Sequence, residues 1–384
     1  MILAICVLGD HIQSLGIVRI AGRLGYRVIL INDDTMCISR FSKYCTKFIT
    51  YRTESELFDN LTRLSESENG ILLMPTNDRF VKYVVDHHEY LSSRFTMSTP
   101  APAVLNVCYN KKLTYQKALE LGIPIPESHF PETYEDITAI SKNLSFPVII
   151  KPSVMHNLYD MTGKKVYVCQ NRDDLLRNYS KAIRIVKPSE IIIQKLIVGR
   201  AKNLYSYCSF FANSRVYGSF IAHRIRQKPM DFGISTTFAV SVLNEEIKKS
   251  ATRFLKGIDY FGLSEVEFMY DPDDATYKLI EINPRTWKWH SIANKLGINL
   301  IQMLISYFNG IEIMKRENNK QDRGWIESIT DTYVAVGEII KGRMTLGEYL
   351  STLSVEKEHA CFDRRDPMPA LGYMLLLPYL FFTR

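Results

Sequence analysis

Lys278-Leu279-Ile280-Glu281-Ile282-Asn283-Pro284-Arg285 is a short apolar stretch that carries an acid, an amide and a guanidinium. Turn-forming residues 271–274 separate it from a similar stretch, Ser264-Glu265-Val266-Glu267-Phe268-Met269, so the two predict an antiparallel hairpin. Side chains alternate along a strand, so Glu281 and Asn283 share one face and Glu267 can join them. Three oxygen donors of this kind suit Mg²⁺, and Arg285 can reach phosphates bound beside it. A solvated acidic hairpin is the alternative.

Further landmarks precede the hairpin along the chain. Residues 113–126 have helical spacing, follow Lys111 and end in Gly122-Ile123-Pro124. Two apolar, strand-like segments come next: residues 146–152 contain Lys151, and residues 191–197 lie just before Gly199. This order and spacing resemble the ATP-grasp superfamily, whose closing strand carries Glu-x-Asn followed by Arg. The resemblance covers about residues 1–310.

The beginning of the chain predicts a strand, a helix and a second strand, over residues 2–9, 14–24 and 25–32. A dinucleotide fingerprint needs closely spaced glycines, and Gly9 and Gly16 do not supply them, so NAD is not expected. In ATP-grasp enzymes such a domain usually helps bind the non-nucleotide substrate. The substrate candidates are therefore Asp10, His11, Ser14 and Leu15, with Asn77 and Asp78 after a later strand. An N-cap role is the alternative for Ser14.

The expected fold class is α/β, with a Rossmann-like N-terminal domain followed by a two-lobe, α+β ATP-grasp fold. The predicted division is 1–105 for the N-terminal domain, 106–195 and 196–310 for the two lobes, and 311–384 for a C-terminal extension with an apolar tail.

The resemblance also assigns the nucleotide contacts. Lys111 and Lys151 match family lysines that hold ATP phosphates. Gly163-Lys164-Lys165-Val166 occupies the place of the family's mobile glycine-rich loop, where Lys164 and Lys165 would supply charge. The hinge that presents backbone groups to adenine corresponds to Gln194, Lys195, Leu196 and Ile197.

Arg224 and Arg226 lie two residues apart in a predicted strand and are expected to share a face. Two guanidiniums can hold a carboxylate and the phosphoryl group that moves toward it, so both are candidate catalytic residues with Arg285. A basic surface strand is the alternative.

Several motifs resemble a narrower subgroup, the carboxylate–amine ligases related to D-aspartate ligase. They are Leu8-Gly9-Asp10, residues 40–45, Arg285-Thr286-Trp287 and residues 363–369. The resemblance implies that ATP and two Mg²⁺ ions drive the formation of an acyl phosphate on a small carboxylate substrate. An amine substrate then displaces the phosphate. A cell-envelope precursor is a candidate substrate by analogy. The alternatives are an ATP-grasp carboxylase or kinase, and a non-catalytic ATP-binding scaffold.

Composition predicts an ordinary globular protein of 384 residues, with 46% hydrophobic and 23% charged residues. The net charge is +7, and the basic residues are scattered along the chain, so no nucleic-acid partner is expected. The seven cysteines form no Cys-x-x-Cys pair and no secretory signal is recognised, which favours reduced thiols and a cytoplasmic location. Residues 369–382 are apolar but contain Pro378 and are too short to span a bilayer. This tail is expected to contact a membrane surface or a protein, or to pack back. A homodimer is among the expected assemblies.

Overall fold

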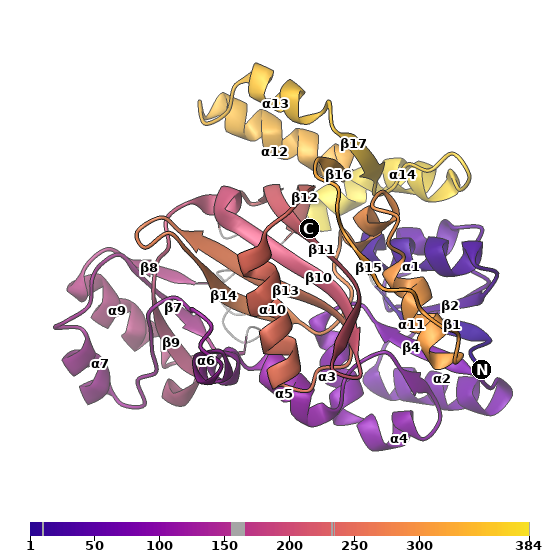
Figure 1. The fold of residues 1–384 in the computed structure, drawn as a ribbon, viewed down its shortest axis with the longest axis horizontal. Helices are drawn as coiled ribbons and strands as arrows, with labels where there is room; N and C mark the ends of the chain where they lie inside the picture. Colours follow the sequence, from indigo (N-terminus) through magenta and orange to yellow (C-terminus); the bar gives the residue numbers. More distant parts are fainter. Residues whose placement is uncertain (10, 155–165, 232, 234, 384) are drawn as a thin grey trace.

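The structure is a computed structural model that describes residues 1–383 except 10, 155–165, 232 and 234. Its strands form three sheets, which lie in the N-terminal domain, in a small lobe and in a large central layer (Figure 1). Three C-terminal helices lie together along one side of the central layer in the same view; they are α12 (Ser328–Ile340), α13 (Leu346–Thr352) and α14 (Met368–Thr383).

The N-terminal sheet is parallel, with the order β3-β2-β1-β4-β5. All five residues of β1 and of β4 are buried, as expected for parallel strands with helices on both faces. The helix predicted over residues 14–24 begins earlier, at His11. The elements are β1 (Ala4–Leu8), α1 (His11–Arg23), β2 (Arg27–Ile31), η1 (Ile38–Phe41), β3 (Lys47–Ile49), α2 (Glu54–Ser67), β4 (Ile71–Pro75), α3 (Asp78–Asp86), α4 (His88–Ser92) and β5 (Thr96–Met97).

The small lobe has an antiparallel sheet with the order β6-β9-β7-β8. Its helix α7 begins at a capping box between Thr133 and Asp136 and buries Ile137, which joins the core of this lobe. The elements of this region are α5 (Pro102–Tyr109), α6 (Lys111–Glu120), β6 (Ser128–His129), α7 (Tyr134–Ile140), β7 (Val148–Pro152), β8 (Tyr167–Cys169), α9 (Arg172–Ala182), η2 (Pro188–Glu190) and β9 (Ile191–Lys195).

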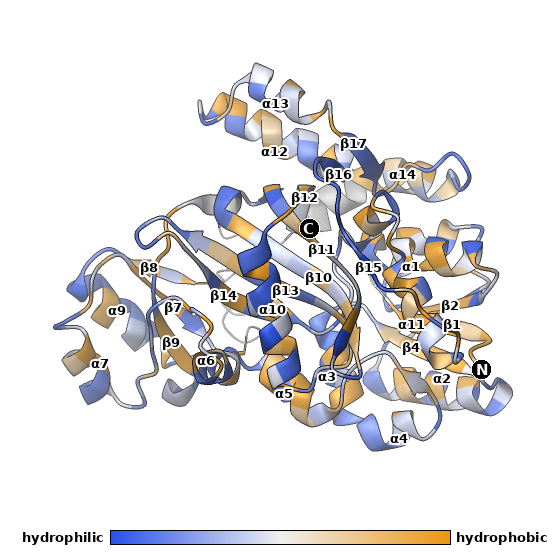
Figure 2. Ribbon diagram, in the orientation of Figure 1, coloured by the Kyte–Doolittle hydropathy of each residue, from blue (hydrophilic) through white to orange (hydrophobic). Residues whose placement is uncertain are grey.

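The central sheet has the order β14-β13-β10-β11-β12-β16-β17, and β15 pairs with β11. The amphipathic helix α10 covers this sheet. In Figure 2 hydrophilic (blue) and hydrophobic (orange) segments alternate along the helix. The elements are η3 (Arg200–Asn203), β10 (Leu204–Ala212), β11 (Arg215–Lys228), β12 (Ser235–Val242), α10 (Glu245–Gly257), β13 (Gly262–Asp271), β14 (Thr276–Asn283), η4 (His290–Asn294), α11 (Leu300–Phe308), β15 (Arg316–Glu317), β16 (Arg323–Ile326), α12 (Ser328–Ile340), α13 (Leu346–Thr352), β17 (Glu356–His359) and α14 (Met368–Thr383).

The C-terminal extension is continuous with this sheet. Its strand β16 pairs with β12, and β17 pairs with β16. Helix α14 runs through Pro378. None of the described helices is long and apolar enough to cross a membrane. The extension is thus built into the same layer as the hairpin.

An ionic contact joins the extension to the N-terminal domain. The carboxylate of Asp366 accepts hydrogen bonds from Arg19 Nε at 2.9 Å, Ser42 Oγ at 2.7 Å and the backbone N of Lys43 at 3.0 Å. Residues 40–45 and 363–369, which carry part of the subgroup resemblance, therefore contact each other directly. This contact gives both motifs a structural role.

Candidate active site

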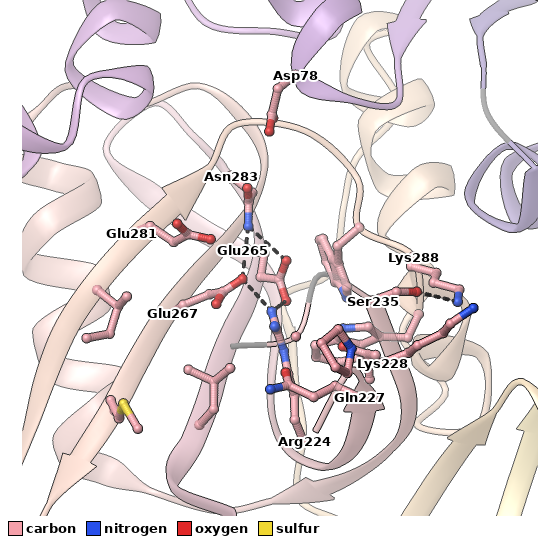
Figure 3. A pocket seen from close by; sticks show the side chains of 18 of the residues that line it. Asp78, Arg224, Gln227, Lys228, Ser235, Glu265, Glu267, Glu281, Asn283 and Lys288 are labelled. Atoms are coloured by element: carbon pink, nitrogen blue, oxygen red, sulfur yellow. Dashed lines mark hydrogen bonds and ion pairs between the residues drawn. The ribbon is translucent and has the colours of Figure 1, made fainter. Parts of the chain in front are cut away.

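A large cavity of about 1560 Å³ lies among the N-terminal domain, both lobes and the C-terminal extension. Its walls include Asp78 from the first region, Lys151 from the second, Glu267 from the third and Glu327 from the fourth. Figure 3 shows part of this cavity, with the acidic hairpin on one side and Lys228 and Lys288 on the other.

The acidic hairpin is present as predicted. Strands β13 and β14 are antiparallel, with Glu265 opposite Asn283 and Glu267 opposite Glu281. A β-bulge at Ile280 follows the second pair, because Phe268 is already opposite Leu279. The Asn283 Nδ2 atom donates to Glu265 Oε2 and to Glu267 Oε1, both at 3.1 Å (Figure 3). The acids of the hairpin therefore share the face that the alternation predicted.

Two cations neutralise these acids. Lys111 Nζ lies 2.9 Å from Glu281 Oε2, and Arg224 Nη2 lies 2.9 Å from Glu265 Oε1 and also contacts Glu267. Burial alone would lower the pKa of Lys111, but Glu281 outweighs it and the pKa is raised. The pKa of Arg224 is likewise raised, because Glu267 and Glu265 outweigh its burial. Both side chains therefore carry their charge into the cavity.

The donor set fits a hard cation. Among the described residues no three His, Cys, Asp or Glu side chains are gathered as a metal site. Lys111 and Arg224 pair with the carboxylates of the hairpin. Glu267 and Glu281 would hold Mg²⁺ once these counter-ions move to bound phosphates. Asn283 could add its Oδ1 by turning its amide, because the two amide positions have nearly the same shape.

Glu265 was not among the predicted site residues. It is 2% exposed, lines the cavity and contacts both Arg224 and Asn283. The sequence did contain a signal, because Glu265 lies two residues before Glu267 and must share its face in a strand.

Arg285 connects the hairpin to the N-terminal domain. Its Nε donates to Asp78 Oδ1 at 2.7 Å, and its Nη2 donates to Asn283 Oδ1 at 3.1 Å. Burial alone would raise the pKa of Asp78, but Arg285 outweighs it and the pKa is lowered. Asn77 also lines the cavity, and its side chain caps α3 by accepting from Phe80 N at 3.0 Å. The two predicted substrate residues of this strand end are thus both at the site.

Lys151 is buried on β7 and lines the cavity. Its Nζ donates to Tyr115 Oη at 2.6 Å and to Gln194 Oε1 at 2.8 Å. Burial, with a smaller contribution from Lys111, lowers the pKa of Lys151 to about 7. The Gln194 amide is fixed in turn, since its Nε2 donates to Ser128 Oγ at 2.8 Å. The side chain of Gln194 therefore orients this lysine.

All four residues of the predicted adenine hinge, Gln194 to Ile197, line the cavity, and so do Val198 and Gly199. The backbone N of Lys195 donates to Glu127 O, and that of Leu196 donates to Pro147 O at 3.1 Å, so both amides are already used. The side chain of Lys195 turns to Asp271 and Asp273. Nearby apolar side chains make a wall suited to a flat base; they are Ile149, Ile197, Met269 and Ile280. Lys164 and Lys165 lie outside the described residues.

Two of the four substrate residues predicted at the start of α1, Ser14 and Leu15, are wrong. Ser14 is fully buried against Ser39, with 2.7 Å between their Oγ atoms, and Leu15 belongs to the apolar core, so neither lines the cavity. Ile12 and Gln13 line it instead, because the helix begins three residues earlier than expected and turns a different face outward. Asp10 lies outside the described residues, and the side chain of His11 is likewise not described.

The N-cap alternative for Ser14 also fails, since α1 begins at His11.

Gly16 allows close packing between α1 and His290. A methyl group at this position would lie 2.6 Å from His290 Nε2, which contacts Gln13 O at 3.1 Å. Burial lowers the pKa of His290 to about 4, so this histidine is a neutral packing residue.

The expectation that Arg224 and Arg226 share one face is wrong. The pairing of β11 with β12 is irregular on both sides of Arg226. Arg226 is fully buried and makes two 2.8 Å hydrogen bonds to Asp331, whereas Arg224 faces the acids of the hairpin. A bulge reverses the alternation locally. Arg226 is absent from the cavity wall formed by the described residues, so its role here is structural.

The cavity is lined by lysines and by an acidic hairpin, in a chain whose described strands form three sheets. Residues 224–315 match the family model described as the carbamoyl-phosphate synthase L chain, ATP binding domain. Over 250 residues the chain is 24% identical to the D-aspartate ligase of Enterococcus faecium (strain Aus0004), a match that covers 63% of this chain and 59% of that protein. The chain thus spans less than two thirds of that relative's length.

Solved structures show the same fold. The Staphylococcus aureus N5-carboxyaminoimidazole synthetase complexed with ADP gives a TM-score of 0.68 at 15% identity, over 88% of this chain and 86% of that chain. The biotin carboxylase domain of the Hydrogenobacter thermophilus 2-oxoglutarate carboxylase, in complex with MgADP, ADP and bicarbonate, gives 0.64 at 15% identity, over 83% and 72%. The predicted α/β ATP-grasp fold and the resemblance to ATP-grasp ligases are confirmed.

Proposed function

We propose that the protein is an ATP- and Mg²⁺-dependent carboxylate–amine ligase. The observation that carries this proposal is the pairing of Glu267 with Glu281 across β13 and β14, next to Asn283 and Arg285. Lys111 and Lys151 line the same cavity, which supports their proposed role as phosphate-binding cations beside the proposed metal ligands. The ligase among the chain's relatives and the nucleotide-bound structural neighbours support the same reaction class.

The nucleotide would lie between the lobes. The base would occupy the apolar wall near Ile149 and Met269, and the phosphates would extend toward Lys111, Lys151 and the hairpin. Bound Mg²⁺ supplies charge neutralisation on the phosphate oxygens. Two ions are proposed, with Glu267, Glu281 and Asn283 as their protein ligands and phosphate oxygens completing the set.

The reaction would proceed in two transfers. A substrate carboxylate oxygen attacks the γ-phosphorus of ATP, the bond to ADP breaks, and an acyl phosphate forms. An amine then attacks the acyl carbon, inorganic phosphate leaves, and the amine loses a proton to give an amide. Arg285 and Arg224 would orient the carboxylate and stabilise its phosphorylated form. Such transfers depend more on positioning and charge than on a general base.

Release of ADP and phosphate tests this proposal. Purified protein would be given Mg²⁺-ATP with pooled carboxylates and amines, and the products would be identified by mass spectrometry. Amide formation with one ADP and one phosphate per turnover is expected. A carboxylated or phosphorylated product without consumption of an amine would favour the carboxylase or kinase alternative, and nucleotide binding without turnover would favour the scaffold.

Two variants are compared in this assay: Glu281→Gln tests the site, and Glu66→Gln is the matched control. Glu281 pairs with Lys111 at the site, whereas Glu66 is exposed on α2. Loss of turnover in the first variant and full activity in the second would assign the reaction to this cavity. Equal activity in both would contradict the proposal.

A contact through the C-terminal tail is proposed with it. On α14, Leu375 is 82% exposed and Leu371 is 46% exposed, which supports a membrane-surface or protein contact. The test is sedimentation of the protein with anionic vesicles, compared between the unchanged chain and the Leu371→Glu and Leu375→Glu variants.

Several expectations stay predictions: a cell-envelope substrate, a homodimer, the absence of a nucleic-acid partner, a cytoplasmic location and the domain boundaries.

A further inference from the structure

One end of the cavity is built by residues that the nucleotide does not need. We name it the extension arm and define it by Ser235, Lys288, Glu327, Thr330 and Tyr373, all of which line the cavity. The cavity volume of about 1560 Å³ exceeds the range of about 300–1,000 Å³ that is common for one ligand. The arm therefore has room for a second molecule beside ATP.

A hydrogen-bond network fixes Lys288 in this arm. Lys288 Nζ donates to Ser235 Oγ at 2.6 Å (Figure 3) and also pairs with Glu327. Thr330 Oγ1 donates to Glu327 Oε1 at 2.7 Å, and the Tyr373 hydroxyl donates to the same atom. Burial alone would raise the pKa of Glu327, but Lys288 outweighs it and the pKa is lowered. Three donors thus share one buried, ionised carboxylate.

Lys288 and Glu327 offset each other within the arm, and Lys228 adds a positive charge beside it. An ammonium has three N–H donors, and the two partners above leave Lys288 one donor for a ligand. Lys228 lines the same part of the cavity (Figure 3), and its Nζ lies 5.8 Å from the centre of the Tyr333 ring. No carboxylate pairs with Lys228 among the described residues, and Asp231 lies near Arg343, 3.6 Å away. An anionic group is the ligand that this charge favours.

The remaining walls of the arm are apolar. Ile329 and Tyr333 come from α12, Leu377 comes from α14, and Trp287 lies one residue before Lys288. Trp287 is buried, and its indole Nε1 has no hydrogen-bond partner within the described part of the chain. A ligand with an apolar body could lie along these side chains while its anionic group contacts the lysines.

We propose that the extension arm binds the second substrate of the enzyme, an organic molecule with an apolar body and a carboxylate held by Lys288 and Lys228. This inference rests on the proposed ligase function, because only then is the bound molecule a substrate. Its binding can be measured without turnover. The carboxylate held by the two lysines serves to recognise the substrate and is separate from its reacting group. Its reacting group would extend toward Arg285, three residues before Lys288.

Binding of a matched pair of probes tests the proposal. Calorimetric titration of the full chain, saturated with Mg²⁺ and ADP, would compare 3-phenylpropionate with the neutral 3-phenylpropionamide. We expect the carboxylate to bind at least about tenfold more tightly than the amide, because an amide cannot pair with an ammonium. We expect Lys228→Met and Lys288→Met each to remove most of that preference, while Lys142→Met, at an exposed site outside the cavity, keeps it.

Each other outcome has a defined meaning. Equal affinity for the two probes, no binding at millimolar concentration, or a preference retained in both lysine variants would overturn the proposal. Lys228 is exposed, so its variant reports on binding even if Lys288→Met unfolds by leaving Glu327 unpaired. ADP binding is measured in the same titration series. Failure of the ligase proposal would appear as absent turnover with the probe preference intact, which keeps the two failures distinct.

Discussion

The two ends of the cavity differ in how the chain builds them. The acidic hairpin takes Glu267, Glu281 and Asn283 from two neighbouring strands joined by one turn. The extension arm instead gathers residues that are far apart in the sequence, such as Ser235, Lys288 and Tyr373. The comparison shows that strand alternation makes a local site predictable, whereas a site assembled across a sheet depends on the order of its strands. Strand β16 brings Glu327 to the arm by pairing with β12.

The largest expected effect tests the hairpin end. Glu281→Gln should lower ATP turnover by roughly a thousandfold, because a neutral amide cannot replace a metal-binding carboxylate. Glu265→Gln should lower ATP turnover by about tenfold to a hundredfold, since Glu265 orients Arg224 and Asn283 and is not one of the proposed metal ligands. Steady-state ADP release measures both. A larger loss for Glu265→Gln would move the metal ligand to that residue.

The second effect separates the two arginines of β11. Asp331→Ala should lower the free energy of unfolding by about 3–5 kcal/mol, because it leaves the buried charge of Arg226 unpaired. Urea denaturation measures the change. The double variant Arg226→Leu with Asp331→Leu should recover much of it, because both charges are then removed. If Asp331→Ala changed turnover in the folded protein without changing stability, Arg226 would return to the list of catalytic residues.

A third prediction concerns pH and Lys151. The pKa of Lys151 is lowered to about 7 in the free protein, and bound phosphates favour its charged form. The affinity for ATP should therefore fall as the pH rises above 7, with a slope approaching about tenfold per pH unit. Lys151→Arg should remove this slope, because a guanidinium stays charged. Calorimetry with ATP from pH 6 to pH 9 would show it, and identical slopes in both proteins would contradict the assignment.

The smallest expected effect tests the arm. Tyr373→Phe removes one hydrogen bond to Glu327, worth about 1 kcal/mol, and should weaken binding of 3-phenylpropionate by about fivefold without changing ADP affinity. Tyr349→Phe is the matched control, since the Tyr349 hydroxyl contacts Thr332 at 3.0 Å outside the cavity. Equal effects of the two variants would show that Tyr373 does not position Lys288 for binding.

The parts predicted from sequence are those with short-range causes. Alternation and a turn placed Glu267 and Glu281 opposite one another, and the strand before Pro152 put Lys151 in a buried position. The errors also have local physical reasons. A bulge turned Arg226 away from Arg224, and an earlier helix start moved Ser14 into the core. No residue type marks the bulge, whereas Asp10, a residue type common at N-caps, directly precedes the observed first residue of α1.

The sequence by itself determined the hairpin, the order of the strands along the chain and the ATP-grasp resemblance, because periodicity, turn residues and motif spacing act over a few residues. Only the tertiary structure decided that Asp78 pairs with Arg285, that Asp366 joins the extension to the N-terminal domain and that Lys288 is fixed by Glu327. Each of these contacts joins residues tens to hundreds of positions apart. Their positions follow from how the sheets and helices pack together, which no local pattern records.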